Sequence, residues 1–537
     1  PDSPHLPVKS GGMKRISIYD STLRDGAQAQ GISYSVEDKV KIVERLDALG
    51  VHYIEAGNPG SNPKDLEFFE RVRGMKLKNA KLIAFGATRK IGIKAEDDGN
   101  VRSILAAGTD AVAIFGKSWD YQVTDILRTK LDENLRMIGD TVRHLKQQGK
   151  EVVYDAEHFF DGFKANPDYA LATLKAAAEA GADCLCLCDT NGGTFPDVIH
   201  DITKQVAAQF KTPLGIHCHN DCEMAVANSV MAVQAGATQV QGTINGIGER
   251  CGNANLCSII PDLQLKLGYE CIPPQNMATL TTVARAVSDI ANMPHNEKAA
   301  YVGADAFAHK GGMHVDAVVK NPVSYEHIDP DLVGNSRRTL MSEVAGRSTL
   351  LARIRAVDPS IGKDSPETKK IIDRLKQLEH EGYHFEAAEQ SFELVVRKML
   401  GKYTPFFELV EFKVMVNEPS VNSMNSSAMI KIRVGNDTEI TAAEGDGPVN
   451  ALDKAVRKAL ERFYPAIGEI RLTDYKVRVL DSQEASAAKV RVLIESTDQR
   501  EHWTTIGVST DIIDASWQAL VDSIEYKLVK DQEAGRG

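Results

Sequence analysis

From Met13 to about Gly268, short apolar runs alternate with longer segments whose apolar residues recur every three to four positions. The runs predict β-strands and the longer segments predict amphipathic helices, as in Glu37–Leu49, where Val40, Val43 and Leu46 share one face. Eight such strand and helix units are typical of a (β/α)8 TIM barrel, an α/β fold. The eight predicted strands are Ile16–Tyr19, Tyr53–Ala56, Lys81–Phe85, Ala111–Phe115, Val152–Tyr154, Cys184–Cys188, Leu214–His217 and Gln239–Thr243.

Beyond the barrel, the pattern predicts two further regions. Helical periodicity predicts a helical linker over residues 281–390, whereas alternating apolar and polar positions from about Ser391 predict strands. Strands followed by a helix occur twice in this last part, which indicates an internal repeat. We therefore predict a barrel over residues 13–280, a linker over 281–390 and a C-terminal α+β domain over 391–530. The helices expected after the barrel are Met277–Asn292, Ser336–Ala356, Ser365–Leu378, 449–463 and 512–529.

The composition is typical of an ordinary soluble protein, and it excludes several classes of partner. The net charge of −11 argues against a nucleic-acid partner, which needs a basic face. No apolar run reaches the ~18 residues that cross a bilayer, so we expect no membrane partner. Residues 1–12 lack the layout of a signal peptide, and we expect them to be a cloning remnant before Met13.

The cysteines indicate a reducing compartment. None of the eight stands in a C-x-x-C spacing, which argues against zinc ribbons and thioredoxin-type redox sites. Cys184, Cys186 and Cys188 alternate along one predicted strand and share a face, which is typical of buried free thiols. We expect a cytoplasmic protein without disulfides.

Polar side chains gather just after the predicted strands. The chemistry of a TIM barrel takes place at the C-terminal ends of its strands. The position of these side chains therefore favours a role in function over the alternative that they are ordinary solvated loop residues. The N-terminal strand ends carry fewer such residues. The polar residues that end or follow the eight strands are Asp20, Arg24, Asp25, Glu55, Asn58, Lys117, Asp155, Glu157, Asp189, Thr190, His217, His219, Asn245, Glu249, Arg250 and Asn253.

His217-Cys218-His219 predicts a metal site. Residues two apart on a strand point the same way, so both imidazoles can converge on one ion. A carboxylate completes a mixed nitrogen and oxygen shell, and Asp25 can supply it because closure of the barrel brings its strand near that of His217. A lone H-x-H is a weak signal, but here it stands at a strand end together with an Arg-Asp turn.

Several segments resemble the acyl-CoA-condensing barrels, the family of 2-isopropylmalate, homocitrate and citramalate synthases. The similar segments are DSTLRDG at 20–26, HCHND at 217–221, GIGERCGNA at 246–254, FAHKGGMH at 307–314 and GDGPVNA at 445–451. Within the family, YDAEHFFDG at 154–162 and NPGSNP at 58–63 are most similar to the longer (R)-citramalate synthases. 2-Isopropylmalate synthases more often carry His-Ser-Ser-Gly-Ile-His where residues 309–314 read His-Lys-Gly-Gly-Met-His.

The resemblance implies a reaction and a role for each candidate residue. It implies that acetyl-CoA condenses with pyruvate, and that a divalent cation (Mn, Mg, Zn or Co) assists. Arg24 would bind substrate and stabilise developing negative charge, and Glu157 would be the general base. Simpler interpretations are that Arg24 only forms an ion pair, that Glu157 is a structural hydrogen-bond acceptor and that Tyr325 packs in the core. The other implied roles are metal binding by Asp25, His217, His219 and Asn253, substrate binding by Thr190, and proton transfer by His314 and Tyr325.

The resemblance also implies assembly and regulation. The C-terminal domain resembles the family's regulatory and dimerisation domain, which implies a homodimer and feedback inhibition by isoleucine. His314 and Tyr325 follow the barrel in sequence, so they could reach a barrel mouth only by folding back, over that of a partner subunit.

Three alternatives remain open at this stage. The first is 2-isopropylmalate synthase or another 2-keto acid acyltransferase. The second is an acyl-CoA lyase, since hydroxymethylglutaryl-CoA lyases share the barrel, although their Gly-Gly-Cys-Pro loop is missing here. The third is a decayed barrel kept as an amino-acid sensor, which would be expected to have lost its metal ligands.

Overall fold

The structure is a computed structural model that describes residues 14–309, 312–339, 342–343, 351, 354–385, 387–418, 425–480, 487–498 and 500–535. The chain divides into two compact units, residues 1–344 and 345–537. Their boundary lies inside the predicted linker, residues 281–390. The predicted cloning remnant lies outside the described residues.

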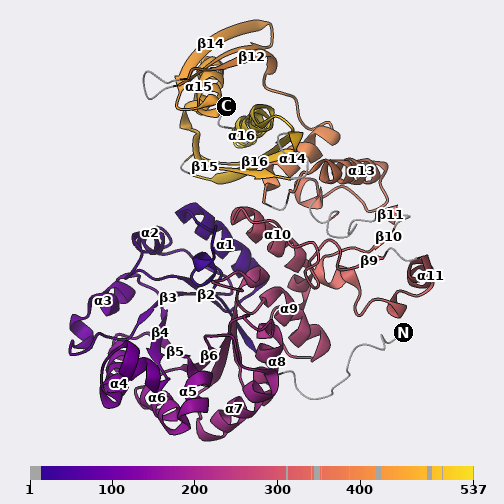
Figure 1. The fold of residues 1–537 in the computed structure, drawn as a ribbon. Helices are drawn as coiled ribbons and strands as arrows, with labels where there is room; N and C mark the ends of the chain where they lie inside the picture. The colour runs from indigo at the N-terminus through magenta and orange to yellow at the C-terminus, as the bar shows by residue number, and fades with distance from the viewer. Residues whose placement is uncertain are drawn as a thin grey trace. The chain divides into compact units, whose positions relative to one another are not determined.

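The first unit is built on a closed barrel of eight parallel strands in the order β1 to β8 (Figure 1). The predicted fold class is confirmed, and each predicted strand is present within a few residues of its expected bounds. Strand β5 is longer than predicted because backbone pairing continues into the polar rim, where side-chain periodicity gives no signal. The strands are β1 (Ser17–Asp20), β2 (Tyr53–Gly57), β3 (Lys81–Ala87), β4 (Ala111–Lys117), β5 (Glu151–Glu157), β6 (Cys184–Asp189), β7 (Leu214–Cys218) and β8 (Gln239–Gly242).

Helices surround the barrel, and their ends follow local sequence signals. Helix α1 begins with a capping box, in which Ser35 and Asp38 exchange side-chain and backbone hydrogen bonds. It ends at Gly50, whose φ of 101° is left-handed and favours glycine. The surrounding helices are α1 (Val36–Leu49), α2 (Pro63–Arg71), α3 (Gly99–Ala106), α4 (Leu131–Gln147), α5 (Phe159–Ala165), α6 (Pro167–Glu179), α7 (Pro196–Gln209) and α8 (Ala225–Ala235).

The inside of the barrel is part apolar and part polar. Tyr19, Phe85 and the three cysteines of β6 belong to one buried cluster there, and these cysteines are free thiols as predicted. Carboxyl groups also lie inside the barrel, where Glu55 and Asp155 are buried. Buried carboxyl groups need hydrogen-bond partners to offset their desolvation.

The segment after the barrel differs from the prediction at two places. The predicted helix Met277–Asn292 is a 3₁₀ turn followed by α10, and the predicted helix Ser336–Ala356 is wrong where β10 and β11 lie. Strand β10 pairs in parallel with β9, some thirty residues earlier in the chain, and local periodicity cannot report such a pairing. The elements are α9 (Leu256–Pro261), η6 (Pro274–Thr279), α10 (Leu280–Ile290), β9 (Ala308–His309), α11 (Gly312–Lys320), η7 (Pro322–Ser324), η8 (Pro330–Val333), β10 (Arg338–Thr339) and β11 (Ser342–Glu343).

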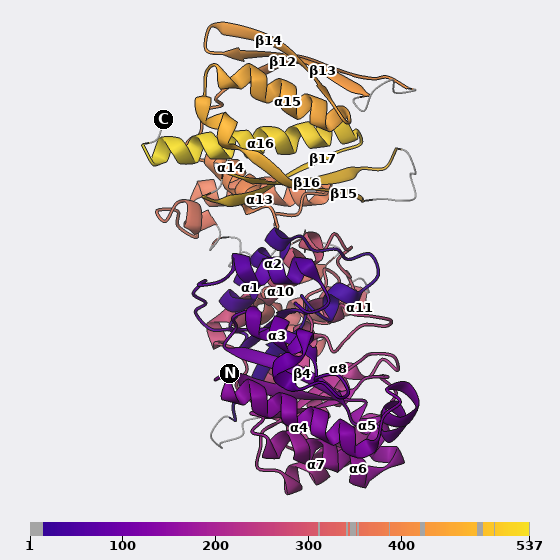
Figure 2. The same ribbon diagram turned by 90° about the vertical axis from the view of Figure 1, so that its left-hand side faces the viewer.

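The second unit holds two successive copies of three antiparallel strands and a helix, which confirms the predicted repeat. Helix α15 lies along the β12–β14 sheet, and α16 lies along the β15–β17 sheet (Figure 2). The expectation of strands from about Ser391 is wrong, because α14 buries Phe392, Leu394 and Val396 there. The elements are α13 (Pro366–Glu381), α14 (Glu389–Met399), β12 (Glu408–Val416), β13 (Ser426–Val434), β14 (Asp437–Gly445), α15 (Pro448–Glu461), β15 (Arg471–Val479), β16 (Val490–Thr497), β17 (His502–Ser509) and α16 (Ile512–Glu533).

Among the described helices, none combines the length and the apolar character that spanning a bilayer requires.

The core of the second unit yields a stability prediction. Trp503 is buried, and its indole N–H donates to the carbonyl and hydroxyl oxygens of Ser523. We expect Trp503→Ala to lower the free energy of unfolding of this unit by ~3–5 kcal/mol, through lost burial and a cavity. Urea denaturation followed by circular dichroism measures the change. The exposed Ile512 is the control, since Ile512→Ala should shift stability by no more than ~0.5 kcal/mol; equal effects would contradict the assignment of the core.

Candidate metal centre and active site

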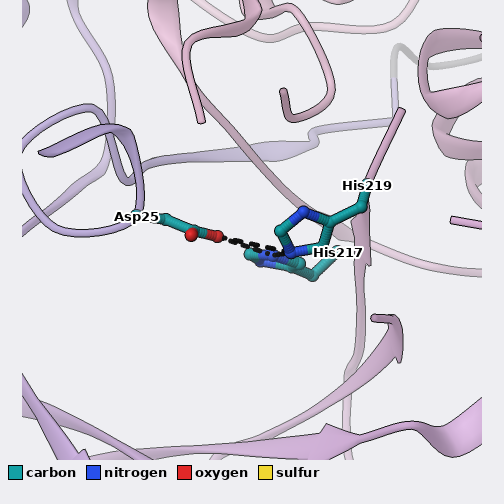
Figure 3. Close-up of side chains that lie close together, drawn as sticks. All are labelled: Asp25, His217 and His219. Atoms are coloured by element: carbon teal, nitrogen blue, oxygen red, sulfur yellow. Dashed lines mark hydrogen bonds and ion pairs between the residues drawn. The ribbon is translucent and has the colours of Figure 1, made fainter. Parts of the chain in front are cut away.

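Three predicted metal ligands converge at the mouth of the barrel (Figure 3). Asp25 follows β1, while His217 and His219 lie at the end of β7. Oδ2 of Asp25 is 3.1 Å from Nε2 of His217 and 3.6 Å from Nε2 of His219, and the two Nε2 atoms are 3.3 Å apart. All three residues are buried. Three ligand atoms directed at one small space are what a bound cation requires.

The pKa values of these three residues describe a site that favours positive charge, with a proton held by His217. Burial opposes a charge on His217, but the hydrogen bond to Asp25 and its negative charge outweigh burial and raise the His217 pKa to about 10. Burial and the neighbouring positive charge of His217 lower the pKa of His219 to about 4. Burial acts to raise the pKa of Asp25, yet Arg24 and the imidazoles hold it well below its usual range. Asp25 therefore stays ionised and attracts positive charge.

Asn253 lies beside the three ligands. A backbone bridge joins it to His219, and its buried Oδ1 has no hydrogen-bond partner among the described residues. A buried amide oxygen without a partner is costly unless a ligand completes it. Two imidazole nitrogens, a carboxylate and this oxygen form a mixed donor set that suits a divalent cation.

A second group of ligand-type residues does not favour a metal. Asp155, Cys186 and Cys188 also lie close together inside the barrel. Burial raises the pKa of the Cys186 thiol well above its usual value. Cys186 and Cys188 belong to the buried apolar cluster inside the barrel, and we interpret this group as part of that core.

Arg24 is held in place from two sides. Its Nε donates to Oε1 of the buried Glu55 at 2.5 Å, and its guanidinium carbon lies 3.8 Å from the ring centre of Phe85. Tyr19 and Ser21 also donate to Glu55. The desolvation of Arg24 is outweighed by Glu55 and Asp25, which together raise its pKa further. Arg24 is thus a permanent, immobile positive charge next to Asp25.

Gln241 and Glu55 contact the candidate residues. The sequence indicated Glu55 only as one of the polar residues at the strand ends, and it did not single out Gln241. Oε1 of Gln241 is 2.9 Å from Nδ1 of His217, and Nε2 of Gln241 donates to Asp155 at 3.0 Å. The available signal was a polar residue at an inward-facing position of a predicted strand. That signal does not name a partner, because the partners come from strands far apart in sequence.

Glu157 and Thr190 lie at neighbouring strand ends. Oε2 of Glu157 is 2.9 Å from Nζ of Lys117, its register partner on β4. Thr190 follows β6, and its Oγ1 accepts a hydrogen bond of 2.8 Å from the backbone N–H of His158. His158 itself has a φ of 58°, a rare value for a residue with a side chain. Backbone strain of this kind is concentrated at functional sites.

His314 and Tyr325 lie close to each other, away from the barrel mouth. Their rings stack with centres 4.2 Å apart, and both side chains are exposed. Figure 1 shows α11, which carries His314, separated from the barrel strands by α9 and α10. The structure therefore does not bring this pair to the barrel mouth of the same chain. Lys310 and Gly311 of the same motif lie outside the described residues.

Family comparisons cover most of the chain. The HMGL-like family matches residues 15–287, the homocitrate synthase post-HMGL domain-like family matches 301–383, and the LeuA allosteric (dimerisation) domain matches 386–528. An (R)-citramalate synthase of Aquifex aeolicus is 54% identical, over 97% of this chain and 99% of that protein.

The chain belongs to the HMGL-like family, among the (R)-citramalate synthases. An (R)-citramalate synthase of Geobacter sulfurreducens is 52% identical, over 97% of this chain and 99% of that protein. A 2-isopropylmalate synthase of Methanocaldococcus jannaschii is 31% identical, over 96% of this chain and 95% of that protein. As a member of this family, the chain is an enzyme, an acyltransferase with a TIM barrel and a LeuA-type C-terminal domain.

The raised pKa of His217 makes a prediction about cation binding. At pH 7 this imidazole is protonated without a metal, and it must lose a proton to become a ligand. Binding of Mn²⁺ should therefore release about one proton, and affinity should rise about tenfold per pH unit below that pKa. Isothermal titration calorimetry in buffers of different ionisation enthalpy measures the release. Binding heats that do not depend on the buffer would contradict it, and Asp25→Asn should bind far more weakly.

Proposed function

We propose that this enzyme condenses acetyl-CoA with pyruvate and hydrolyses the resulting thioester, giving (R)-citramalate and free coenzyme A. One observation carries the proposal. The buried group of Asp25, His217 and His219 lies beside the immobile Arg24, in a chain about half identical to (R)-citramalate synthases over nearly its full length.

A divalent cation is part of the proposal. We assign its ligands as Asp25, His217 and His219, with Asn253 as a further partner, and manganese, magnesium, zinc and cobalt all suit this donor set. The chemistry that such a cation supplies when bound is Lewis-acid polarisation of the keto group. The ionised Asp25 supports this assignment, since it already attracts positive charge to the site.

Arg24 is assigned to charge stabilisation. Removal of a methyl proton from acetyl-CoA makes an enolate, and its attack on the keto carbon turns the keto oxygen into an alkoxide. A fixed cation stabilises both of these anions without reorganising during the reaction. The pairing with Glu55 and the stacking on Phe85 support this role, because they fix the guanidinium before substrate arrives.

Glu157 is assigned as the base that takes the methyl proton, and Thr190 as a donor to the keto-acid carboxylate. The side-chain oxygen of Thr190 already accepts from the backbone N–H of His158. Its own hydroxyl proton is therefore directed elsewhere and is available to a substrate anion. Oε2 of Glu157 is held in place by Nζ of Lys117, 2.9 Å away.

The thioester step and assembly complete the proposal. Water adds to the thioester carbonyl, and coenzyme A leaves as the new carboxylate forms. We assign proton transfer in this step to His314 and Tyr325 of a partner subunit, since both are exposed in this chain. The match to the LeuA allosteric (dimerisation) domain supports a homodimer, and we propose that isoleucine is its feedback inhibitor. We place the enzyme in the cytoplasm, with a catalytic region over 13–280, a linker over 281–390 and a regulatory region over 391–530.

Release of free coenzyme A from acetyl-CoA, with pyruvate and Mn²⁺, tests the reaction. Comparing kcat/KM for pyruvate, 2-oxobutanoate and 2-oxoisovalerate separates this activity from that of a 2-isopropylmalate synthase, since one methylene changes binding by ~1–3 kcal/mol. Cleavage of hydroxymethylglutaryl-CoA would instead indicate a lyase. No release with any small 2-keto acid, from folded protein, would refute the proposal.

Glu157→Gln should lower kcat by about 10²–10⁴-fold, because an amide cannot take up the methyl proton. Pyruvate binding should remain, since the keto acid does not need the base. Steady-state kinetics and calorimetry with pyruvate measure the two effects. Glu151→Gln is the matched control, since Glu151 lies at the opposite end of the same strand. Unchanged turnover in Glu157→Gln would remove Glu157 from this role.

Arg24→Lys should lower kcat by about 10²–10³-fold, because a lysine ammonium cannot reproduce the planar guanidinium that Glu55 and Phe85 hold. Arg89→Lys is the control for loss of a buried guanidinium, since Arg89 pairs with Glu133 and Asp140. That control should lower stability and leave kcat unchanged. Equal kcat losses in both variants would show that Arg24 acts through stability alone.

A further inference from the structure

A buried hydrogen-bond chain crosses the inside of the barrel. It begins at Asp155 on β5, continues through Gln241 on β8 and ends at His217 on β7. The side-chain amide of Gln241 joins the two ends, with Nε2 donating to Asp155 at 3.0 Å and Oε1 lying 2.9 Å from Nδ1 of His217. All three residues are buried, so no bulk water competes for these groups.

We propose that Gln241 is a positioning residue that sets the tautomer of His217 for metal binding. Nε2 of Gln241 donates to Oδ1 of Asp155, so the NH₂ group of the amide lies on the Asp155 side. The amide oxygen then faces His217, and an amide oxygen only accepts hydrogen bonds. Nδ1 of His217 must therefore carry the hydrogen, which leaves the lone pair on Nε2 toward Asp25 and His219 when the cation binds.

The reversed amide would be unfavourable at both ends. Gln241 would then no longer donate its hydrogen bond to Oδ1 of Asp155, and its NH₂ group would force Nδ1 of His217 to be the acceptor. The hydrogen would move to Nε2, the atom that must bind the cation. His219 offers a contrast, because its Nδ1 has no hydrogen-bond partner among the described residues. The chain from Asp155 thus orients one of the two imidazoles.

The inference rests on the metal site of the proposed function, and it is tested without the reaction. The experiment titrates Mn²⁺ alone into the metal-stripped full chain by calorimetry. Gln241→Leu should weaken binding about 10–100-fold, the usual range for a lost partner of a metal-binding histidine. Gln241→Glu keeps an acceptor for Nδ1–H of His217 and should bind more tightly than the leucine variant.

Gln239→Leu is the matched control. Gln239 lies two residues earlier on β8 and accepts a longer hydrogen bond, 3.4 Å, from Gln241. Its register partner is Gly215, whereas that of Gln241 is His217, so its side chain lies one layer deeper in the barrel. We expect Mn²⁺ affinity within about threefold of wild type for this variant, since it keeps the acceptor on Nδ1 of His217.

Thermal unfolding in EDTA shows whether each variant is folded. Equal Mn²⁺ affinity of wild type and folded Gln241→Leu would overturn the inference, as would equal losses in Gln241→Leu and Gln241→Glu. If the leucine variant does not fold, NMR of the ¹⁵N-histidine-labelled, zinc-loaded wild type decides, because an unprotonated Nδ1 of His217 would refute the proposal. Absence of Mn²⁺ binding in wild type would instead refute the metal site itself.

Discussion

The pairing of β1 with β8 closes the barrel, and the metal-ligand group depends on this closure. Asp25 follows the first strand and His217 ends the seventh, so an open sheet would hold them at nearly opposite edges. Once the sheet is closed, the carboxylate oxygen and the two imidazole nitrogens lie 3.1 to 3.6 Å from one another. The free energy that forms the parallel barrel therefore also offsets the cost of bringing these buried polar groups together.

The carboxyl groups of Glu55 and Asp155 are compatible with a stable barrel interior because each accepts hydrogen bonds from neighbouring donors. Glu55 accepts from Tyr19, Ser21 and Arg24, and Asp155 accepts from Gln241. A buried charge without such partners would cost several kcal/mol. The same contacts hold Arg24 and His217 in place. The groups that satisfy the buried carboxyls by hydrogen bonds therefore also preorganise the candidate site.

The second unit is built from two successive copies of one pattern, three antiparallel strands and a helix. Each repeat places one helix against three antiparallel strands, and buried residues of both repeats, such as Leu452 and Trp503, belong to one cluster. The β15–β17 sheet lies between α16 on one face and α13 and α14 on the other. On the β12–β14 sheet, apolar residues such as Met415 and Ile440 are exposed.

The sequence by itself determined the succession of strands and pointed to the candidate site at the strand ends and to three candidate metal ligands, because these follow from local periodicity and from the rule that chemistry lies after the strands. His217 and His219 share a strand, so their convergence is a local property. Tertiary structure alone decided the contacts of Gln241 with Asp155 and of Glu55 with Arg24, and the pairing of β10 with β9. These contacts join segments far apart in the chain, and only the closed barrel and its packed surroundings determine which side chains meet.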